Sequence, residues 1–213
     1  MAAHRLTSEV ITDEAALRAV LGGEAIPLVR AKISGHLTPE TRPFVELSPF
    51  VCLATSTARG DCDVSPRGDP PGFVRILDAR TLLVPDRPGN RLADSLRNIL
   101  ANPHVGLLFV VPGVDDTFRV NGRATLTTDA ALLAPSTVEG KAPKLGIIVD
   151  IDEAYTQCSK AFLRSHLWDP ARFRARTDLP SNGEILAGLT DDVDADEYDE
   201  ARAGRYARRE GFY

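Results

Sequence analysis

The stretch TLLVPDRPGNRLADSLRNILANPHVGLLFVV, residues 81–111, holds the pattern that decides the fold. An apolar, β-branched run at 81–85 passes through a loop rich in Pro and Gly into an amphipathic helix at about 91–101. Asn102-Pro103 ends this helix, because proline disfavours helical geometry in the residue before it. The continuous apolar run 105–113 then indicates a strand that is buried on both faces.

More runs with the character of strands lie on both sides of this stretch. Apolar and β-branched residues define candidate strands at 50–57, 62–68, 117–128 and 145–158, and turn signals separate them. Only one helix interrupts the series. A doubly wound parallel sheet would need a helix after nearly every strand. The pattern therefore favours a mainly β fold, a small antiparallel barrel with helical decoration.

The composition is that of a globular protein, and the charge argues against one class of partner. The chain has 213 residues, 43% of them hydrophobic and 26% charged, with a formal net charge of −5 at pH 7. Binding to a nucleic acid backbone requires a basic face, so we expect no nucleic acid partner. No apolar run approaches the roughly 18–20 residues of a membrane span, and acidic residues stand where a signal peptide would be apolar. We therefore expect a cytoplasmic protein with no membrane partner.

We expect a single domain over residues 1–213, with an N-terminal helical segment at 1–48 and a C-terminal helical or irregular segment at 159–213. The acidic stretch 191–200 precedes a basic one. This arrangement fits a solvated helix with end-to-end charge pairing, or a partly ordered tail.

The cysteines and histidines point to neither disulfides nor a metal site. Three cysteines without paired spacing fit a reducing compartment. The four histidines lack the spacing of metal ligands, so we expect no metal. A nucleophilic enzyme that uses Cys62 or Cys158 is a weaker alternative, because neither has a neighbouring histidine in the sequence.

The loop before the helix is a candidate anion site. Arg87 and Arg91 flank the expected N-terminus of the helix, which already carries partial positive charge, and this is unfavourable unless an anion binds there. Asn90 is a good N-cap residue, which would leave free N–H groups beside the two arginines. The alternative is an exposed loop whose arginines pair with carboxylates.

Two other segments carry polar groups that could reach the same ligand. Ser65 and Arg67 stand at the end of a β run, followed by a turn rich in Pro and Gly. Lys160 and Arg164 are four residues apart and share a helix face, with Trp168 one turn further along. The alternatives are a turn stabilised by Asp69 and Arg67, and a solvated helix face whose tryptophan closes the core.

Taken together, residues 43–168 resemble the pyridoxamine 5′-phosphate oxidase-like, FMN-binding split barrels. The matching segments occur in the family's order: PFVCLATS, ARGD, DVSPRGD, TLLVPDRPGNR, LADSLRNILANP, VGLLFVV and FRVNGRATL. SPRGDPPGFV, GNRLADSLRNI and QCSKAFLRS look most like a bacterial subgroup of that family. The resemblance implies a six-stranded antiparallel split β-barrel and a homodimer with an FMN site at each subunit interface.

The resemblance also implies which residues bind FMN. The pair 90–91 matches the polar and basic positions at the start of the family's helix, and 65–67 matches the strand that reaches phosphate or ribityl. Residues 84–86 match the strand edge under the isoalloxazine, and the segment 160–168 would reach the cofactor, from the same or the other subunit. The implied set is Ser65, Pro66, Arg67, Val84, Pro85, Asp86, Asn90, Arg91, Lys160, Arg164 and Trp168.

The implied function is that of an FMN-dependent oxidoreductase acting on an unidentified small molecule. The alternative is a split barrel that binds flavin or haem without turnover. The loop DRPGN replaces the family's Ser/Thr-rich loop, and the basic motif that grips pyridoxamine phosphate has no clear match, so we do not expect vitamin B6 oxidation. A flavin carries its own electron chemistry, so the lack of a catalytic triad or carboxylate pair does not argue against an enzyme.

Overall fold

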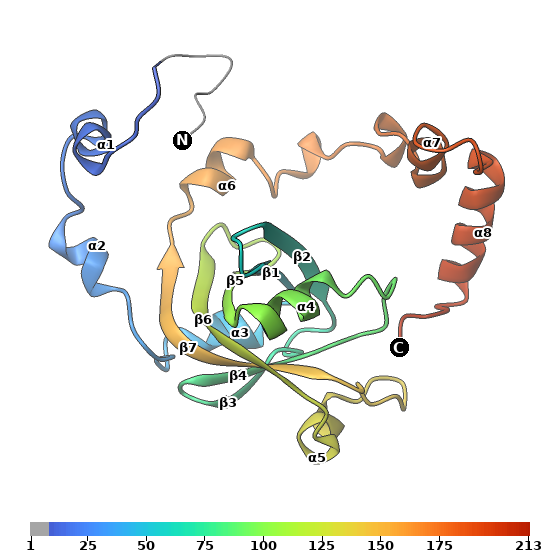
Figure 1. The fold of residues 1–213 in the computed structure, drawn as a ribbon, viewed down its shortest axis with the longest axis horizontal. Coiled ribbons are helices and arrows are strands. Elements are labelled where there is room, and N and C mark those ends of the chain that lie inside the picture. The colour runs from blue at the N-terminus through green and yellow to red at the C-terminus, as the bar shows by residue number, and fades with distance from the viewer. Residues whose placement is uncertain (1–8) are drawn as a thin grey trace. The chain divides into compact units, whose positions relative to one another are not determined.

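The computed structural model describes residues 9–213, so residues 1–8 of the expected N-terminal helical segment lie outside the described part (Figure 1). The chain divides into two compact units, the first ending at Ile33 and the second spanning Ser34–Tyr213. In the first unit, helices α1 (Glu14–Leu21) and α2 (Pro27–Ala31) bury none of their side chains. The expectation of a single domain stays a prediction.

The second unit contains a seven-stranded sheet in which every neighbouring pair is antiparallel. The order of strands is β2-β1-β5-β6-β7-β4-β3. The fold is therefore mainly β, as the sequence predicts. The strands are β1 (Phe50–Ser56), β2 (Cys62–Gly68), β3 (Arg75–Asp78), β4 (Thr81–Pro85), β5 (His104–Val110), β6 (Thr117–Thr127) and β7 (Gly146–Gln157).

The structure has one strand more than the six expected. The additional strand is β3, which pairs only with β4 at the edge of the sheet. Its four residues are half-buried or exposed and show no alternation between the two classes. It also follows a stretch rich in Pro and Gly, so no periodic signal marked it as a strand.

The expectation that 105–113 is buried on both faces is wrong. Strand β5 ends at Val110, and its side chains alternate between buried and half-buried. Val105, Leu107 and Phe109 face the core, where Phe109 packs against Phe118 with ring centroids 6.2 Å apart. On the opposite face, Leu108 and Val110 are half-buried but also apolar. Their apolar character hid the period of two in the sequence.

One helix after β4 packs on the sheet, as the sequence predicts. Helix α4 (Asp94–Ala101) lies against β1, β2 and β6. Its contact face is partly polar, because Asn98 Nδ2 donates to Thr55 Oγ1 at 3.0 Å and Ser95 Oγ donates to Asp63 Oδ2 at 3.0 Å. These hydrogen bonds, one buried and one partly buried, fix the position of α4 relative to β1 and β2.

Further helices complete the second unit, among them α7 (Asn182–Ala187) and α8 (Ala195–Ala207). The acidic stretch lies mainly in α8, whose N-cap Asp194 accepts a hydrogen bond from the Glu197 amide at 2.9 Å. Helices α7 and α8 pack together, and the Gly183 amide donates to Asp199 at 3.0 Å. Among residues 9–213, no helix is both long and apolar enough to cross a membrane. The helices are α3 (Arg42–Glu46), α5 (Ala130–Leu133), α6 (Lys160–Ser165), α7 (Asn182–Ala187) and α8 (Ala195–Ala207).

Candidate functional site

A pocket of about 570 Å³ opens where the end of β2, the end of β4 and the loop before α4 meet. Its volume lies within the range of roughly 300–1,000 Å³ that is usual for small-molecule sites. The pocket brings together residues from three of the segments that the sequence singled out. Those that line it are Ser65, Pro66, Arg67, Pro85, Asp86, Asn90 and Arg91.

Two adjacent ion pairs hold this pocket together. Arg67 Nη1 lies 2.6 Å from Asp86 Oδ1, and Arg87 Nε lies 2.6 Å from Asp69 Oδ2. Each pair joins the end of β2 to the loop after β4, although these strands are not neighbours in the sheet. The ion pairs therefore connect strands from opposite parts of the sheet order and form one wall of the pocket.

Arg87 does not serve as the free anion ligand that the sequence suggested. Its Nε binds Asp69, whose side chain is 1% exposed, and its Nη2 donates to the Ser136 carbonyl at 2.8 Å. The alternative interpretation, an arginine paired with a carboxylate, is the one that the structure adopts for this residue. Arg87 thus attaches the beginning of the loop before α4 to Asp69 and Ser136.

Arg91 remains available for a ligand. It is exposed, lines the pocket and forms no ion pair with any residue in the range 9–213. Its φ of 64° lies in the left-handed region, which is uncommon for a residue other than glycine. Residues held in such conformations are concentrated at ligand sites, where the surrounding structure compensates for the strain.

Helix α4 begins later than predicted, and Asn90 is not its cap. The residue at the N-cap is Ala93, which has a φ of 59° and makes no side-chain capping bond. The left-handed backbone at Arg91 and Ala93 stops the helix from extending back to residue 91. Asn90 Oδ1 instead accepts a hydrogen bond from the Leu92 amide at 3.0 Å, which makes a local turn in the loop.

Two more polar groups lining the pocket have no partner in the described part of the chain. Arg67 Nε is buried without a hydrogen bond, although Nη1 of the same guanidinium binds Asp86. The Ser65 hydroxyl also makes no hydrogen bond to the described residues. A buried donor without an acceptor is costly, so a ligand oxygen or a water is needed there. Together with Arg91, these groups suit the phosphate and hydroxyl oxygens of a polar, anionic ligand.

Four of the residues implied by the resemblance lie elsewhere. The Val84 side chain is fully buried in the core. Lys160 and Arg164 are exposed on α6, away from the pocket of their own chain. Trp168 does not continue their helix face, because α6 ends at Ser165 and the next residue adopts a left-handed conformation. Its indole Nε1 instead donates to the Val114 carbonyl at 3.0 Å.

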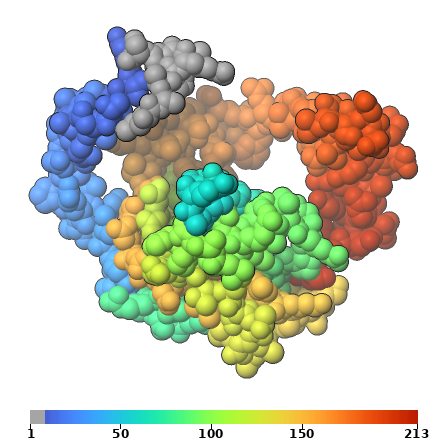
Figure 2. Space-filling view, viewed as in Figure 1, coloured from blue at the N-terminus to red at the C-terminus, as the bar shows by residue number. Residues whose placement is uncertain are grey.

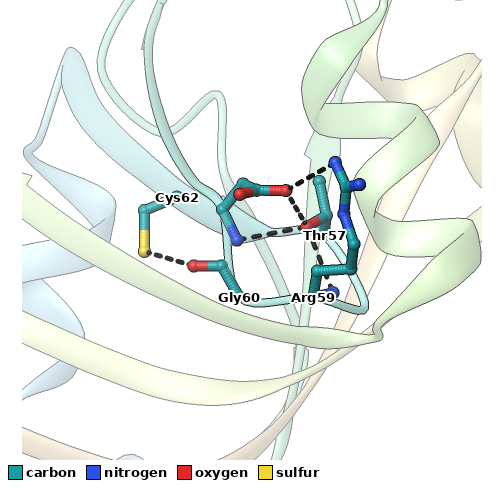
Figure 3. Close-up of polar contacts among 5 residues, drawn as sticks. Thr57, Arg59, Gly60 and Cys62 are labelled. Atoms are coloured by element: carbon teal, nitrogen blue, oxygen red, sulfur yellow. Dashed lines mark hydrogen bonds and ion pairs between the residues drawn. The ribbon is translucent and has the colours of Figure 1, made fainter. Parts of the chain in front are cut away.

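A second hollow, of about 510 Å³, lies beside the turn between β1 and β2, and each of its carboxylates has at least one hydrogen-bond or ion-pair partner. Figure 3 shows this turn, where Asp61 accepts hydrogen bonds from Thr57 Oγ1 at 2.9 Å and from Arg59 at 3.2 Å. The Cys62 thiol points to the Gly60 carbonyl at 3.5 Å and has no basic partner there. This geometry gives no support to a nucleophilic role for Cys62.

Two residues at the base of the site have roles that the sequence did not indicate: Asp69 was expected only to stabilise a turn with Arg67, and Tyr213 was given no role. Asp69 binds Arg87, and the Tyr213 hydroxyl donates to the other Asp69 oxygen at 2.6 Å. Asp69 stood in a turn where a carboxylate is ordinary, and Tyr213 is 144 positions away in sequence. No local pattern connects two such residues.

Comparison with known proteins identifies the family. A family model described as pyridoxamine 5′-phosphate oxidase matches residues 37–158, more than half of the chain. The chain belongs to the pyridoxamine 5′-phosphate oxidase family. The match confirms the resemblance found in the sequence. In this member of the family, the matched segment includes the pocket and ends before α6, α8 and Tyr213.

Several solved structures are similar to this member of the pyridoxamine 5′-phosphate oxidase family, and the search of curated proteins returns no match. HupZ of Group A Streptococcus is 18% identical, with a TM-score of 0.47 over 56% of this chain and 93% of that one. A putative pyridoxamine 5′-phosphate oxidase of Lactobacillus delbrueckii is 24% identical, with a TM-score of 0.45 over 57% and 95%. HutZ, the heme storage protein of Vibrio cholerae, is 16% identical, with a TM-score of 0.40 over 57% and 93%.

Proposed function

We propose that this chain is an FMN-dependent oxidoreductase that acts on a small molecule, and that the pocket between β2, β4 and α4 holds FMN. The observation that carries the proposal is that three residues lining that pocket offer donors without a protein partner in the described part of the chain: the buried Arg67 Nε, the half-buried Ser65 hydroxyl and the exposed Arg91 guanidinium. FMN offers a terminal phosphate and a hydroxylated chain, which are the acceptors that such donors require. We propose with it that the sheet is a split barrel and that the protein is cytoplasmic.

In this proposal the protein binds and orients the cofactor. Arg91 and the backbone of the loop hold the phosphate, while Ser65 and Arg67 Nε bind the phosphate or ribityl oxygens. Pro85 and Asp86 form the strand edge beneath the ring, and the Arg67–Asp86 ion pair fixes that edge. Bound FMN supplies reversible hydride transfer, and no residue of the chain needs to act as a nucleophile.

We propose further that the active form is a homodimer. The face of the sheet turned away from the core carries exposed apolar side chains, with Phe50 38% and Val64 63% exposed. Cys52 and Leu108 lie on the same face, directly opposite each other in the β1–β5 register. Such a continuous apolar surface is typical of an interface. In the dimer, the 160–168 segment of the second copy brings Lys160, Arg164 and Trp168 to the cofactor.

A haem-binding protein is the competing function, and the pocket lining disfavours it. Haem iron takes an axial ligand from His, Cys, Met or Tyr. None of the residues lining the pocket is of these types. Flavin binding without turnover is the other alternative, and it leaves the pocket chemistry unchanged.

The absorption spectrum of the purified protein tests the proposal, together with mass spectrometry of the released ligand. We expect the two visible bands of oxidised flavin, the mass of FMN and bleaching by NADH or NADPH. A Soret band without flavin bands would contradict FMN as the cofactor. Flavin that no reductant bleaches would leave only the binding role. Light scattering at micromolar concentration should give the mass of a dimer, and a monomeric mass would remove the interface proposal.

A further inference from the structure

Tyr213 contacts the ion pair that anchors the ligand loop. Its hydroxyl donates to Asp69 Oδ1 at 2.6 Å, and the Arg87 guanidinium lies over its ring, 5.1 Å from the centroid. The other oxygen of Asp69 binds Arg87 Nε at 2.6 Å. One buried carboxylate thus holds a side chain of the C-terminal segment and a side chain of the loop at the same time.

The residues around Tyr213 also contact the segment 139–141. Arg209 pairs with Glu139 at 2.8 Å, and Lys141 Nζ donates to the Tyr213 carbonyl at 3.0 Å. Figure 2 shows a gap between the red atoms of α7 and α8 and the green atoms of α4. The contacts of residues 209–213 therefore attach this part of the chain to the region of the loop.

Tyr213 also lines two hollows that border the candidate FMN pocket. Two cavities, of about 620 and 650 Å³, are both lined by Tyr213 and Arg87. Each shares loop residues with the candidate FMN pocket, Asn90 in one case and Arg91 in the other. Any displacement of Tyr213 therefore changes the surroundings of the loop that carries Arg91.

We propose that Tyr213 is a positioning residue, which acts through Asp69 and Arg87 to fix the loop 86–91 in its ligand-binding conformation. The loop contains left-handed Arg91, so it needs support from outside to hold that backbone. The hydrogen bond from Tyr213 satisfies Asp69 Oδ1 and keeps the carboxylate turned toward Arg87. Arg87, one residue beyond Asp86, then holds the start of the loop against Ser136.

A thermodynamic consequence follows, which rests on the proposed FMN function. If the docked C-terminal segment raises the affinity of the loop for FMN, bound FMN must stabilise the docked segment by the same factor. Residues 205–213 then become more protected when the pocket fills. The family match ends at residue 158, so Tyr213 lies outside it, whereas Asp69 and Arg87 lie inside it.

The test compares Tyr213→Phe with Tyr206→Phe. Each variant loses one phenol oxygen, but the Tyr206 hydroxyl has no hydrogen-bond partner among residues 9–213, and its ring packs on Phe212 with centroids 5.5 Å apart. Hydrogen–deuterium exchange of the ligand-free protein comes first. We expect faster amide exchange over residues 86–91 in Tyr213→Phe, with exchange of the same loop unchanged in Tyr206→Phe. Unchanged loop exchange in Tyr213→Phe would overturn the proposal.

Titration with FMN provides the second readout. We expect the dissociation constant to rise about fivefold or more in Tyr213→Phe and to stay constant in Tyr206→Phe. FMN should slow exchange over 205–213 in the parent, and this protection should shrink in Tyr213→Phe. If the parent fails to bind FMN, the proposed function is wrong, while ligand-free exchange still decides the role of Tyr213. If FMN binds equally to all three proteins, the positioning role is wrong and the proposed function stands.

Discussion

Arg87 Nε lies 2.6 Å from Asp69 Oδ2, and the Asp69 side chain is 1% exposed. The two residues come from strand ends that are not neighbours in the sheet. A buried ion pair that loses one partner leaves the other charge without compensation. The stability of the region around the pocket therefore depends on this contact far more than on the ion pairs at the surface.

Asp69→Asn should destabilise the protein by about 3–5 kcal/mol, because it leaves the Arg87 guanidinium buried without its counter-ion. Urea denaturation followed by circular dichroism measures the change. Asp61→Asn is the matched control, since Asp61 pairs with Arg59 and both side chains are more than half exposed. That change should cost no more than about 1 kcal/mol. Equal losses in the two variants would show that burial does not distinguish the pairs.

Arg91→Ala should weaken FMN binding by about 1.5–3 kcal/mol, the value of a hydrogen bond to a charged group. Because Arg91 is exposed and unpaired with the described residues, the melting temperature should not change. Fluorescence titration with FMN measures the affinity. Arg97→Ala serves as the control, since Arg97 is exposed on α4 and pairs with Asp94. An unchanged affinity in Arg91→Ala would remove Arg91 from the site.

Arg67→Lys tests the unsatisfied Nε. The substitution keeps the positive charge but removes the planar set of donors. We expect FMN affinity to fall by about 1–2 kcal/mol, since the lysine cannot serve Asp86 and the ligand in the same geometry. Isothermal titration at two salt concentrations separates this loss from an effect of charge. Wild-type affinity in Arg67→Lys would show that net charge alone suffices at this position.

Gly122→Ala tests how closely β6 and β7 approach. A β-carbon at Gly122 would lie 2.1 Å from the Asp150 carbonyl oxygen, next to the register shift between Asn121 and Gly122. The strands must separate to admit it, so we expect a loss of about 1–3 kcal/mol or more. Gly89→Ala is the control for stability, because a β-carbon at this loop position would have no neighbouring atom within 4 Å. Thermal unfolding of the two variants should differ clearly.

Tyr213 should ionise at higher pH than an ordinary tyrosine. Its hydrogen bond to Asp69 is the largest cause that raises the pKa above 10.0, followed by burial and the charge of Asp69. A raised pKa in the folded state means that the stability gained by docking is fully present below about pH 10 and is lost as pH rises through the folded pKa. The ultraviolet absorbance of tyrosinate, compared between the parent and Tyr213→Phe, measures this. A Tyr213 signal that titrates below pH 10 would contradict the contact.

The sequence was informative wherever structure follows from local pattern. Strands β2 and β4 have the bounds that the apolar and β-branched runs indicated, and the position of the single helix before β5 was correct. Strand β3 was missed because four half-buried residues carry no period. The start of α4 was misplaced because Asn90 looks like a cap, and only the backbone at Arg91 and Ala93 reveals that it is not.

Some residues of the candidate site could likewise be predicted from the sequence, and others could not. Residues within the strand ends and the loop, such as Ser65 and Asn90, line one pocket. The resemblance to the family placed them together, whereas the sequence alone made this depend on neighbouring strands, and β2 and β4 are not neighbours. The role of Arg87 could not be read from the sequence, because its partner is set by how the sheet closes and not by its neighbours. Tyr213 lay still further from any local signal, since its contact depends on the path of the whole C-terminal segment.

The position of β2 and β4 in the sheet order has a consequence for how the protein matures. Four strands separate them in that order, so the Arg67–Asp86 bridge can form only after the intervening strands have assembled. A nascent or misfolded polypeptide therefore offers no cavity for the proposed coenzyme. Adding that coenzyme during refolding should increase the yield of native protein, because it binds only the folded state. It should not accelerate the formation of the first hairpins, which precede the pocket.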